Sequence, residues 1–132
     1  MDPAIARSGV PLLGICYGMQ LLALERGAEL VKLDRAEYGP ATLRVLDPPS
    51  PLFTGVPSAS RVWMSHGDSV VASPPELRAI AATDRCEIAV MGDDALKMYG
   101  VQFHPEVVHT EHGRTILDNF VHRGWRILEG LG

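Results

Sequence analysis

The sequence has few cysteines, few aromatic residues and no excess of positive charge. Of its 132 residues, two are cysteines, 6% are aromatic, and the formal net charge is −4. The N-terminus has no basic region leading into an apolar one, as a secretion signal would. We therefore expect Cys16 and Cys86 to be free thiols in a cytoplasmic protein. The scattered Lys and Arg residues form no basic run, so no nucleic-acid partner is expected.

Long apolar runs and nucleotide-binding signatures are also missing. The most apolar stretch, residues 10–24, is interrupted by proline, glycine and glutamine and is too short to span a bilayer, so no membrane association is expected. Neither a P-loop nor a GxGxxG pattern occurs, so the chain itself is not expected to bind ATP or NAD. With 46% hydrophobic and 21% charged residues, the composition is typical of one globular domain.

Alternation and glycine or proline boundaries predict a mixture of short strands and two helices. We expect one helix from Met19 to a C-cap at Gly27, and a second over residues 111–122 capped by Thr110. The Ser65-His66-Gly67-Asp68 segment is predicted to be a polar loop, and a turn is expected at residues 92–94. This pattern indicates an α/β or α+β domain. The expected strands cover residues 10–15, 42–46, 61–64, 77–83, 87–91 and 97–104.

The turn between the first strand and the first helix has the form of a nucleophile elbow with cysteine in the serine position. In GICYG, residues 14–18, Gly14 and Gly18 would allow a sharp turn that presents the sulfur of Cys16. The N-terminal end of the helix would favour the thiolate, and the N–H of Tyr17 could stabilise an oxyanion. The same pattern also fits a buried cysteine in a glycine-flanked turn.

A cysteine nucleophile needs a base, and the HPE segment offers one. In extended chain, residues two apart project to the same side, so Glu106 would hold the imidazole of His104 in one tautomer. His104 and Glu106 could instead join His109, His112 and Glu111 in a metal cluster. Because the spacing does not match a HExxH helix and no cysteine pair supports zinc, no metal site is expected.

Two further segments could bind a small polar ligand. The glycine in the SHGD loop frees backbone groups around Ser65 and His66, and His66 is a second candidate base. Gln20, in the first helical turn, could face the pocket of the nucleophile. Cys86 has no histidine nearby in sequence and is interpreted as structural.

These motifs together resemble the class I glutamine amidotransferases, and within that family they are most like the glutaminase domains of GMP synthases. The resemblance runs from about residue 10 to 121. The segments that carry it are residues 14–20 (GICYGMQ), 37–39 (EYG), 62–68 (VWMSHGD), 101–106 (VQFHPE), 106–107 (EV) and 109–110 (HT).

The resemblance implies a flavodoxin-like α/β fold and a Cys-His-Glu triad. Cys16 would attack the side-chain amide of glutamine, His104 would shuttle the proton, and Glu106 would orient His104. Gln20 and the Ser65–His66 backbone would hold the amino-acid end of the substrate. In the family, the ammonia passes to an ATP-pyrophosphatase domain or subunit that aminates XMP to GMP, so ATP and magnesium would act there and no cofactor is expected in this chain.

The chain also departs from the family pattern. Family members begin with a first strand and a Gly-Gly-Pro loop that supplies an oxyanion amide, and neither is found before Pro3. We therefore expect residues 1–132 to be a partial glutaminase domain that lacks its first strand or strands. Two alternatives remain open: a glutaminase that serves another acceptor, and a catalytically incompetent regulatory or interaction domain.

Overall fold

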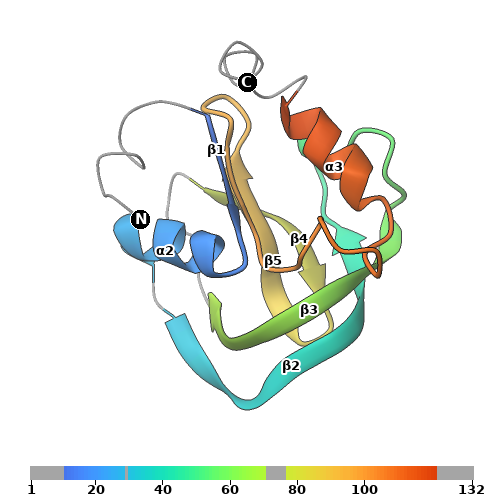
Figure 1. Cartoon of the computed structure of the whole chain (residues 1–132). Helices are drawn as coiled ribbons and strands as arrows, with labels where there is room; N and C mark the ends of the chain where they lie inside the picture. The colour runs from blue at the N-terminus through green and yellow to red at the C-terminus, as the bar shows by residue number, and fades with distance from the viewer. Residues whose placement is uncertain (1–10, 29, 71–76, 122–132) are drawn as a thin grey trace.

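The structure, a computed structural model, describes residues 11–28, 30–70 and 77–121. Within them, one six-stranded mixed sheet has the order β1-β6-β5-β4-β2-β3 (Figure 1). Its strands are β1 (Leu12–Ile15), β2 (Leu30–Val45), β3 (Ala59–Val70), β4 (Arg78–Thr83), β5 (Cys86–Asp93) and β6 (Met98–Val101).

Helical elements cover the two faces of this sheet. Helix α2 (Tyr17–Glu25) packs on one face, and α3 (Gly113–Asn119) with the short 3-10 helix η1 (Pro51–Phe53) packs on the other. Asn119 ties α3 to η1, because its amide nitrogen donates to the carbonyl oxygens of Leu52 and Thr54 at 2.9 and 2.7 Å. The α/β prediction is therefore confirmed. No helix in the described ranges is long and apolar enough to cross a membrane.

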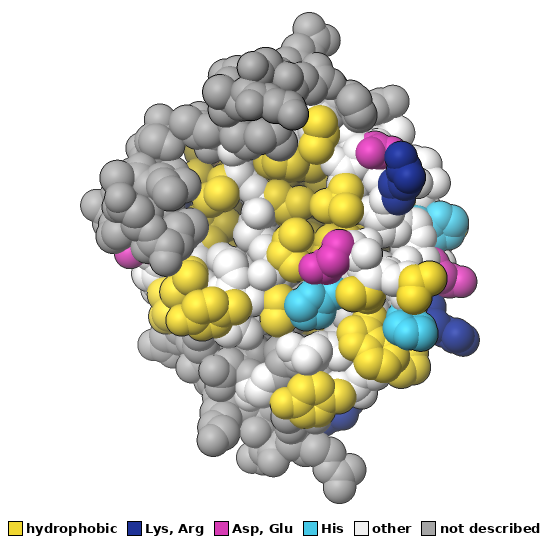
Figure 2. Space-filling model, viewed as in Figure 1, with side chains coloured by type: hydrophobic (Ala, Val, Ile, Leu, Met, Phe, Trp, Pro, Cys, Tyr) yellow, Lys and Arg dark blue, Asp and Glu magenta, His cyan; other side chains and the backbone are white. Residues whose placement is uncertain are grey.

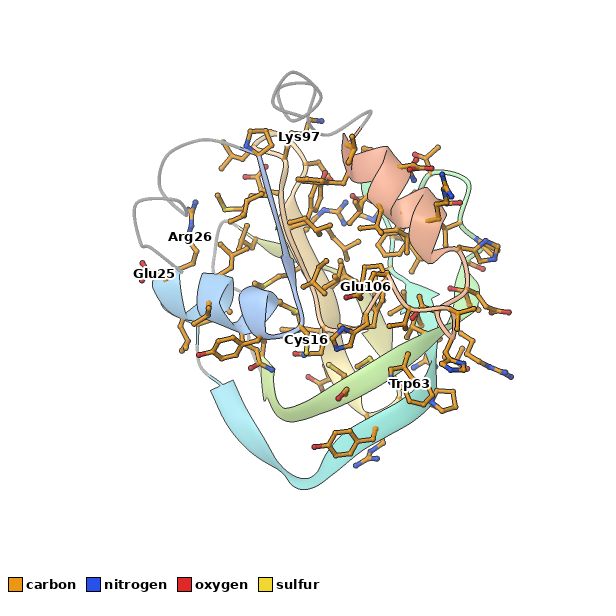
Figure 3. The ribbon with its side chains drawn as sticks, viewed as in Figure 1. Cys16, Glu25, Arg26, Trp63, Lys97 and Glu106 are labelled. Carbon is orange, nitrogen blue, oxygen red and sulfur yellow. The ribbon has the colours of Figure 1, made fainter. Side chains whose placement is uncertain are left out.

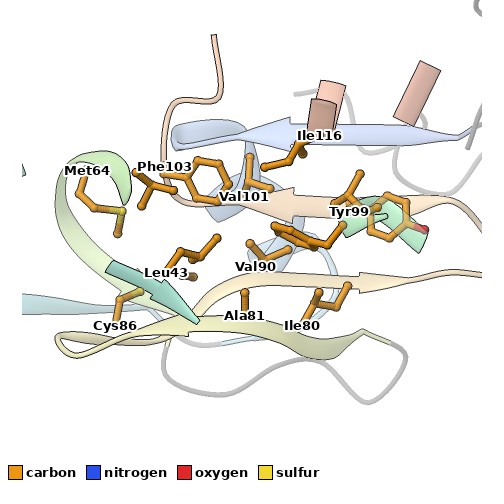
Figure 4. Close-up of a cluster of buried hydrophobic side chains, with 14 of the residues drawn as sticks. Leu43, Met64, Ile80, Ala81, Cys86, Val90, Tyr99, Val101, Phe103 and Ile116 are labelled. Carbon is orange, nitrogen blue, oxygen red and sulfur yellow. The ribbon is translucent and has the colours of Figure 1, made fainter. Parts of the chain in front are cut away.

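Each face of the sheet has its own apolar core. Along β5, Ile88 and Met91 belong to the α2 side, whereas Val90 belongs to the α3 side. Strand β5 is consequently buried on both faces, which accounts for its run of apolar residues. The larger cluster, on the α3 side, is drawn in Figure 4 and includes Leu43, Met64, Ile80, Val90, Tyr99, Val101, Phe103 and Ile116.

The pairing of β1 with β6 is parallel, whereas the other strand pairs are antiparallel. Ile15 lies opposite Val101, and the backbone N–H of Cys16 donates to the carbonyl oxygen of Val101 at 2.7 Å. Parallel strands end at the same edge of a sheet, so the segments that follow β1 and β6 emerge side by side. These segments contain the predicted nucleophile and the predicted base.

Most of the predicted elements are present, but several details were wrong. The strand expected over residues 42–46 is the end of β2, which begins at Leu30, and the strand expected over residues 97–104 already ends at Val101. Residues 65–68, expected to form a loop, lie within β3 and pair with β2, because β3 is an edge strand in which polar residues can face solvent. Residues 92 and 93 continue β5, and the turn follows at residues 94–97. Helix α3 begins at Gly113 after His112, which has left-handed backbone angles, rather than at a Thr110 cap. Residues 10 and 122, at the limits of two predicted elements, lie outside the described residues.

A polar cluster around Asp94 joins three parts of the fold. One carboxylate oxygen accepts from the hydroxyls of Ser50 and Tyr99 at 2.5 and 2.9 Å, and the other accepts from the Arg78 guanidinium at 2.9 Å. The same guanidinium donates to the Pro48 carbonyl at 2.8 Å. The carboxylate thus connects the segment before η1 with β4 and β6.

The charge state of Asp94 follows from these contacts. Burial by itself raises the pKa of the Asp94 carboxyl, but the hydrogen bonds from Ser50, Arg78 and Tyr99 outweigh it, so the pKa lies below the usual value. Burial and the neighbouring Asp94 raise the pKa of Tyr99 well above its usual value. The cluster is therefore held by an ionised Asp94 and a neutral Tyr99.

We predict that Asp94→Asn destabilises the chain in a pH-dependent way. Because the folded-state pKa of Asp94 is lowered, its stabilisation is present above the unfolded value of about 3.9 and is lost as pH falls through the folded value. We expect a loss of about 1–3 kcal/mol at neutral pH, and a gap from the native chain that narrows below about pH 4. Urea unfolding at a series of pH values measures this difference.

The matched control is Asp84→Asn, which breaks an exposed ion pair. Arg44 and Asp84 are 2.7 Å apart, but 49% and 83% of their side chains are exposed. An exposed pair contributes about 0–1 kcal/mol, so this variant should unfold almost like the native chain. A stability gap for Asp94→Asn that stays constant down to about pH 2 would contradict the assigned role of its charge.

Candidate active site

Cys16 is the single residue between β1 and α2, and its backbone is strained. Its φ and ψ angles are 54° and −105°, a conformation that side-chain-bearing residues rarely adopt. The Cys16 carbonyl oxygen accepts the first helical bond, from the N–H of Gln20 at 3.2 Å. Strain of this kind costs about 1–3 kcal/mol and gathers at functional sites. The predicted elbow is present.

Only one of the two flanking glycines is required by a close approach. A Cβ atom on Gly14 would lie 2.7 Å from the backbone carbon and oxygen of Gly18, closer than non-bonded atoms allow. A Cβ on Gly18 would have no neighbour within 4 Å. The prediction that both glycines permit the turn is thus right for Gly14 and wrong for Gly18, because the Cβ direction at Gly18 points into open space.

The sulfur of Cys16 lies against two segments that are distant in sequence. Its thiol donates to the carbonyl oxygen of Ser65 on β3 at 3.4 Å, and the side-chain amide of Gln102 donates to the sulfur at 3.7 Å. Ser65 is 49 residues away from Cys16 in sequence, and Gln102 is 86 away. The elbow, β3 and the end of β6 therefore meet at the sulfur.

The N–H of Tyr17 at the helix end favours the thiolate, as expected, but it does not decide the charge of the resting sulfur. Burial raises the pKa of the Cys16 thiol, and this effect outweighs the hydrogen bonds from the Tyr17 N–H and the Gln102 amide, which lower it. The negative charge of Glu106 raises the pKa further. Cys16 is therefore a protonated thiol at neutral pH, and it needs a base to become a nucleophile.

His104 and Glu106 form the contact that their spacing predicts. The Nδ1 atom of His104 lies 3.3 and 3.5 Å from the two carboxylate oxygens of Glu106. This contact leaves Nε2 as the ring nitrogen available to another group. In Figure 3 the labelled side chains of Cys16 and Glu106 lie in the same part of the molecule, consistent with the effect of the Glu106 charge on the thiol. Within the described residues, the thiol is hydrogen-bonded to Ser65 and Gln102 rather than to His104.

Thr110 fixes the backbone of His104 to β3. Its hydroxyl donates to the His104 carbonyl at 2.7 Å and accepts from the Trp63 N–H at 2.9 Å. The His104 N–H donates to the Trp63 carbonyl at 3.1 Å. A Cβ on Gly113 would collide with the Pro105 carbonyl oxygen, so the start of α3 is also pressed against this loop. The backbone of His104 is therefore held in place by hydrogen bonds to β3 and to Thr110.

Two of the predicted substrate-binding residues are linked to the same sulfur, Ser65 directly and Gln20 through Gln102. Gln20 is buried, and its amide donates to the side-chain oxygen of Gln102 at 3.3 Å. Ser65 is half-buried next to Cys16, and His66 pairs with Glu37 in the β2–β3 register. The side chain of His66 lies outside the described residues, so its candidacy as a base stays a prediction.

The other histidines of the HPE region do not join a metal cluster. Among the described residues, no three His, Cys, Asp or Glu side chains come together in a way that could hold a metal. The His109 ring instead packs on Trp63, with ring centroids 5.0 Å apart. Cys86 is a buried thiol whose Sγ donates to the Ile88 carbonyl, in keeping with a structural role.

Exposed hydrophobic side chains contribute to the surface around the site. Figure 2 shows the face seen in Figure 3, with histidine and acidic side chains set among hydrophobic ones. Tyr17, Tyr38 and Val108 are 68%, 71% and 91% exposed. A separate hollow of about 490 Å³ contains none of the predicted site residues and is lined by Pro40, Ala41, Thr42, Arg61, Asp84 and Arg85.

Two residues of the site were not predicted to belong to it. Gln102 contacts the sulfur only because β1 and β6 pair in parallel, and Thr110 holds His104 rather than capping a helix. The sequence offered one signal for Gln102, its position near the expected end of a strand. Its contact with Cys16 could not be predicted, because the two residues are 86 positions apart and meet only through the pairing of β1 with β6.

Comparison with known families gives a consistent result. A family model described as "Glutamine amidotransferase class-I" matches residues 1–123. A GMP synthase [glutamine-hydrolyzing] from Symbiobacterium thermophilum is 56% identical over 121 residues, which is 92% of this chain and 24% of that protein. The corresponding protein of Nostoc sp. is 50% identical, with 92% and 22% covered. This chain therefore spans about a quarter of the length of these relatives.

Solved structures also resemble the chain. A Thermoplasma acidophilum protein whose description is that of a GMP synthase subunit has a TM-score of 0.84 and 34% identity, with 96% of this chain and 64% of that chain covered. A glutamine amidotransferase from Thermotoga maritima has a TM-score of 0.69 and 26% identity, with 96% and 51% covered.

We predict that Gly14→Ala and Gly18→Ala have opposite effects. The methyl group at residue 14 would force β1 away from α2, and overpacking of this kind typically costs about 1–3 kcal/mol. The methyl group at residue 18 has room, and alanine favours a helix over glycine by about 1 kcal/mol. Thermal unfolding and the rate of Cys16 alkylation should both change in the first variant. Equal behaviour of the two variants would contradict the close approach at the elbow.

Proposed function

The chain belongs to the class I glutamine amidotransferase family, and we propose that it hydrolyses the side-chain amide of glutamine to supply ammonia for GMP synthesis. The observation that best supports this proposal is the meeting of a strained cysteine elbow with a His104–Glu106 pair at the ends of two parallel strands. Within this proposal, Cys16, His104 and Glu106 are the catalytic triad.

The first half of the proposed reaction forms a thioester. The Cys16 sulfur attacks the amide carbon of glutamine while His104 takes the thiol proton on its free ring nitrogen. The Tyr17 N–H, which already lowers the pKa of the thiol, donates to the oxygen that becomes negative. His104 then returns the proton to the leaving nitrogen, and the C–N bond breaks to release ammonia.

The second half restores the enzyme. His104 takes a proton from water, whose oxygen attacks the thioester carbon, and the C–S bond breaks to give glutamate and the Cys16 thiol. Glu106 stabilises the charged imidazole in both halves, since its carboxylate lies within 3.5 Å of Nδ1. A resting thiol is compatible with this scheme, because apo catalytic contacts often tighten only when substrate binds.

We propose that Gln20 and the backbone of Ser65 and His66 hold the amino-acid end of the substrate. Gln20 is hydrogen-bonded to Gln102, whose amide in turn contacts the sulfur of Cys16. Ser65 contacts the thiol directly. In this proposal, glutamine hydrolysis uses Cys16 as the nucleophile and His104 as the proton carrier, and both belong to this chain. The proposal assigns ATP and Mg²⁺ to the partner. The proposed place of action is the cytoplasm.

The proposed partner is an ATP-pyrophosphatase domain or subunit that aminates XMP to GMP. The relatives named GMP synthase are about four times as long as the matched region, as the 24% and 22% coverages indicate. Ammonia made at Cys16 would reach this second part of the enzyme. The alternative partner is a synthetase that aminates another acceptor.

We predict that a diazo-ketone analogue of glutamine labels Cys16 and spares Cys86. Cys16 is half-buried at the elbow, whereas Cys86 is fully buried in the core. Excess glutamine should suppress the labelling, and His104→Ala should slow it by about 100-fold or more, the usual contribution of a general acid–base residue. Peptide mass measurement locates the adduct.

Iodoacetamide treatment of the unfolded chain is the control, because it should modify both cysteines and show that both peptides are detected. A folded chain whose Cys16 resists the analogue would overturn the glutaminase proposal and favour an interaction domain without activity.

We predict a separate role for the hydroxyl of Thr110. Thr110→Val removes the bonds to His104 and Trp63, whereas Thr110→Ser retains a hydroxyl at the same place. We expect kcat for glutamate release to fall about tenfold in the valine variant with little change in KM, since only the base is misplaced. The serine variant should keep most of the activity. Equal losses in the two variants would contradict a specific role for the hydroxyl, because the serine variant keeps it.

A further inference from the structure

Gln102 is a fully buried polar residue whose side-chain amide contacts both Cys16 and Gln20. Its side chain is fully buried directly after β6, between the nucleophile and a predicted substrate-binding residue. Its amide nitrogen lies 3.7 Å from the sulfur of Cys16, and its oxygen accepts from the amide nitrogen of Gln20 at 3.3 Å. Buried amides need such partners, so both ends of the side chain are fixed.

The bond from Gln20 decides which end of the Gln102 amide faces the sulfur. Because the Gln20 side chain donates through nitrogen, the oxygen of Gln102 turns toward it. The NH₂ group of Gln102 is thereby directed at Cys16. The opposite orientation would place a carbonyl oxygen against the sulfur and would repel a thiolate.

The two partners of the sulfur suit different protonation states. The Ser65 carbonyl can only accept, so its bond to Cys16 exists only while the sulfur carries a proton. The Gln102 amide donates, and such a bond becomes stronger when the acceptor is charged. On loss of the proton, the contact with Ser65 therefore becomes unfavourable and the contact with Gln102 is reinforced.

We propose that Gln102 is a positioning residue that holds the Cys16 sulfur in its attacking form, and that Gln20 orients it for this task. This inference rests on the proposed glutaminase function, which assigns no role to Gln102. It links a residue at the substrate's amino-acid end to the nucleophile through one buried amide. A glutamine substrate bound to Gln20 would thus also influence the Gln102 amide, which holds the Cys16 sulfur.

Other charged and titratable groups also act on the sulfur and must be separated from Gln102. Glu106 opposes ionisation of Cys16 by its negative charge, and His104 is the proposed acceptor of the proton. Both residues stay unchanged in a Gln102 variant. A change in the titration of Cys16 in that variant therefore reports the lost amide.

The experiment is the pH dependence of iodoacetamide alkylation at Cys16, followed by peptide mass in the 132-residue chain. We expect Gln102→Met, which keeps the length of the side chain but cannot donate, to raise the apparent pKa by about one unit. That shift means a tenfold smaller thiolate fraction at neutral pH. Gln20→Met, which frees the Gln102 amide to turn, should raise it by a smaller amount.

Thr83→Val is the matched control, since Thr83 is also a buried polar residue and its hydroxyl has no partner among the described residues. It should leave the titration of Cys16 unchanged. An unchanged apparent pKa in folded Gln102→Met overturns the proposal. If that variant does not fold, an unchanged value in Gln20→Met overturns it instead.

Alkylation needs no glutamine, so its outcome can be separated from that of the glutaminase proposal. A pKa shift in a chain that releases no glutamate would retain the effect of Gln102 on the Cys16 sulfur and reject the activity. Normal titration in a variant that still hydrolyses glutamine would reject the role of Gln102 alone.

Discussion

The parallel pairing of β1 with β6 is the constraint on which the site depends. It places Ile15 opposite Val101 and joins the Cys16 N–H to the Val101 carbonyl. Two chain segments more than 80 residues apart therefore leave the sheet together. One provides the sulfur, and the other provides the buried amide and the imidazole. A slip of one residue in this register would turn every side chain of β6 to the opposite face.

A second constraint is the strain stored at Cys16. The backbone with its positive φ is held from both sides, by the bond to β6 and by the first turn of α2. Gly14 permits this turn because no Cβ fits between it and the backbone of Gly18. The local sequence and the distant strand therefore act together, since the glycine allows the conformation and the strand pairing maintains it.

The elbow and the His104–Glu106 contact could be predicted because each follows from a few neighbouring residues. The protonation state of the thiol could not, since it depends on burial by segments brought in by the fold, and the short motif indicated only the helix end. Likewise, residues 65–68 have loop-like composition, and only their place on an edge strand explains their extended form. The roles of Gln102 and Thr110 rest on contacts across the sheet, which periodicity does not report. The catalytic assignments and the substrate-binding roles stay predictions.

The raised pKa of Cys16 has a consequence for the chemical durability of the site. Peroxides and other oxidants attack thiolates far faster than thiols, and over-oxidation of a cysteine to the sulfinic or sulfonic acid is generally irreversible. A sulfur that stays protonated and hydrogen-bonded to the Ser65 carbonyl presents little thiolate to them. The half-buried Cys16 thiol is therefore expected to resist oxidation while it remains protonated.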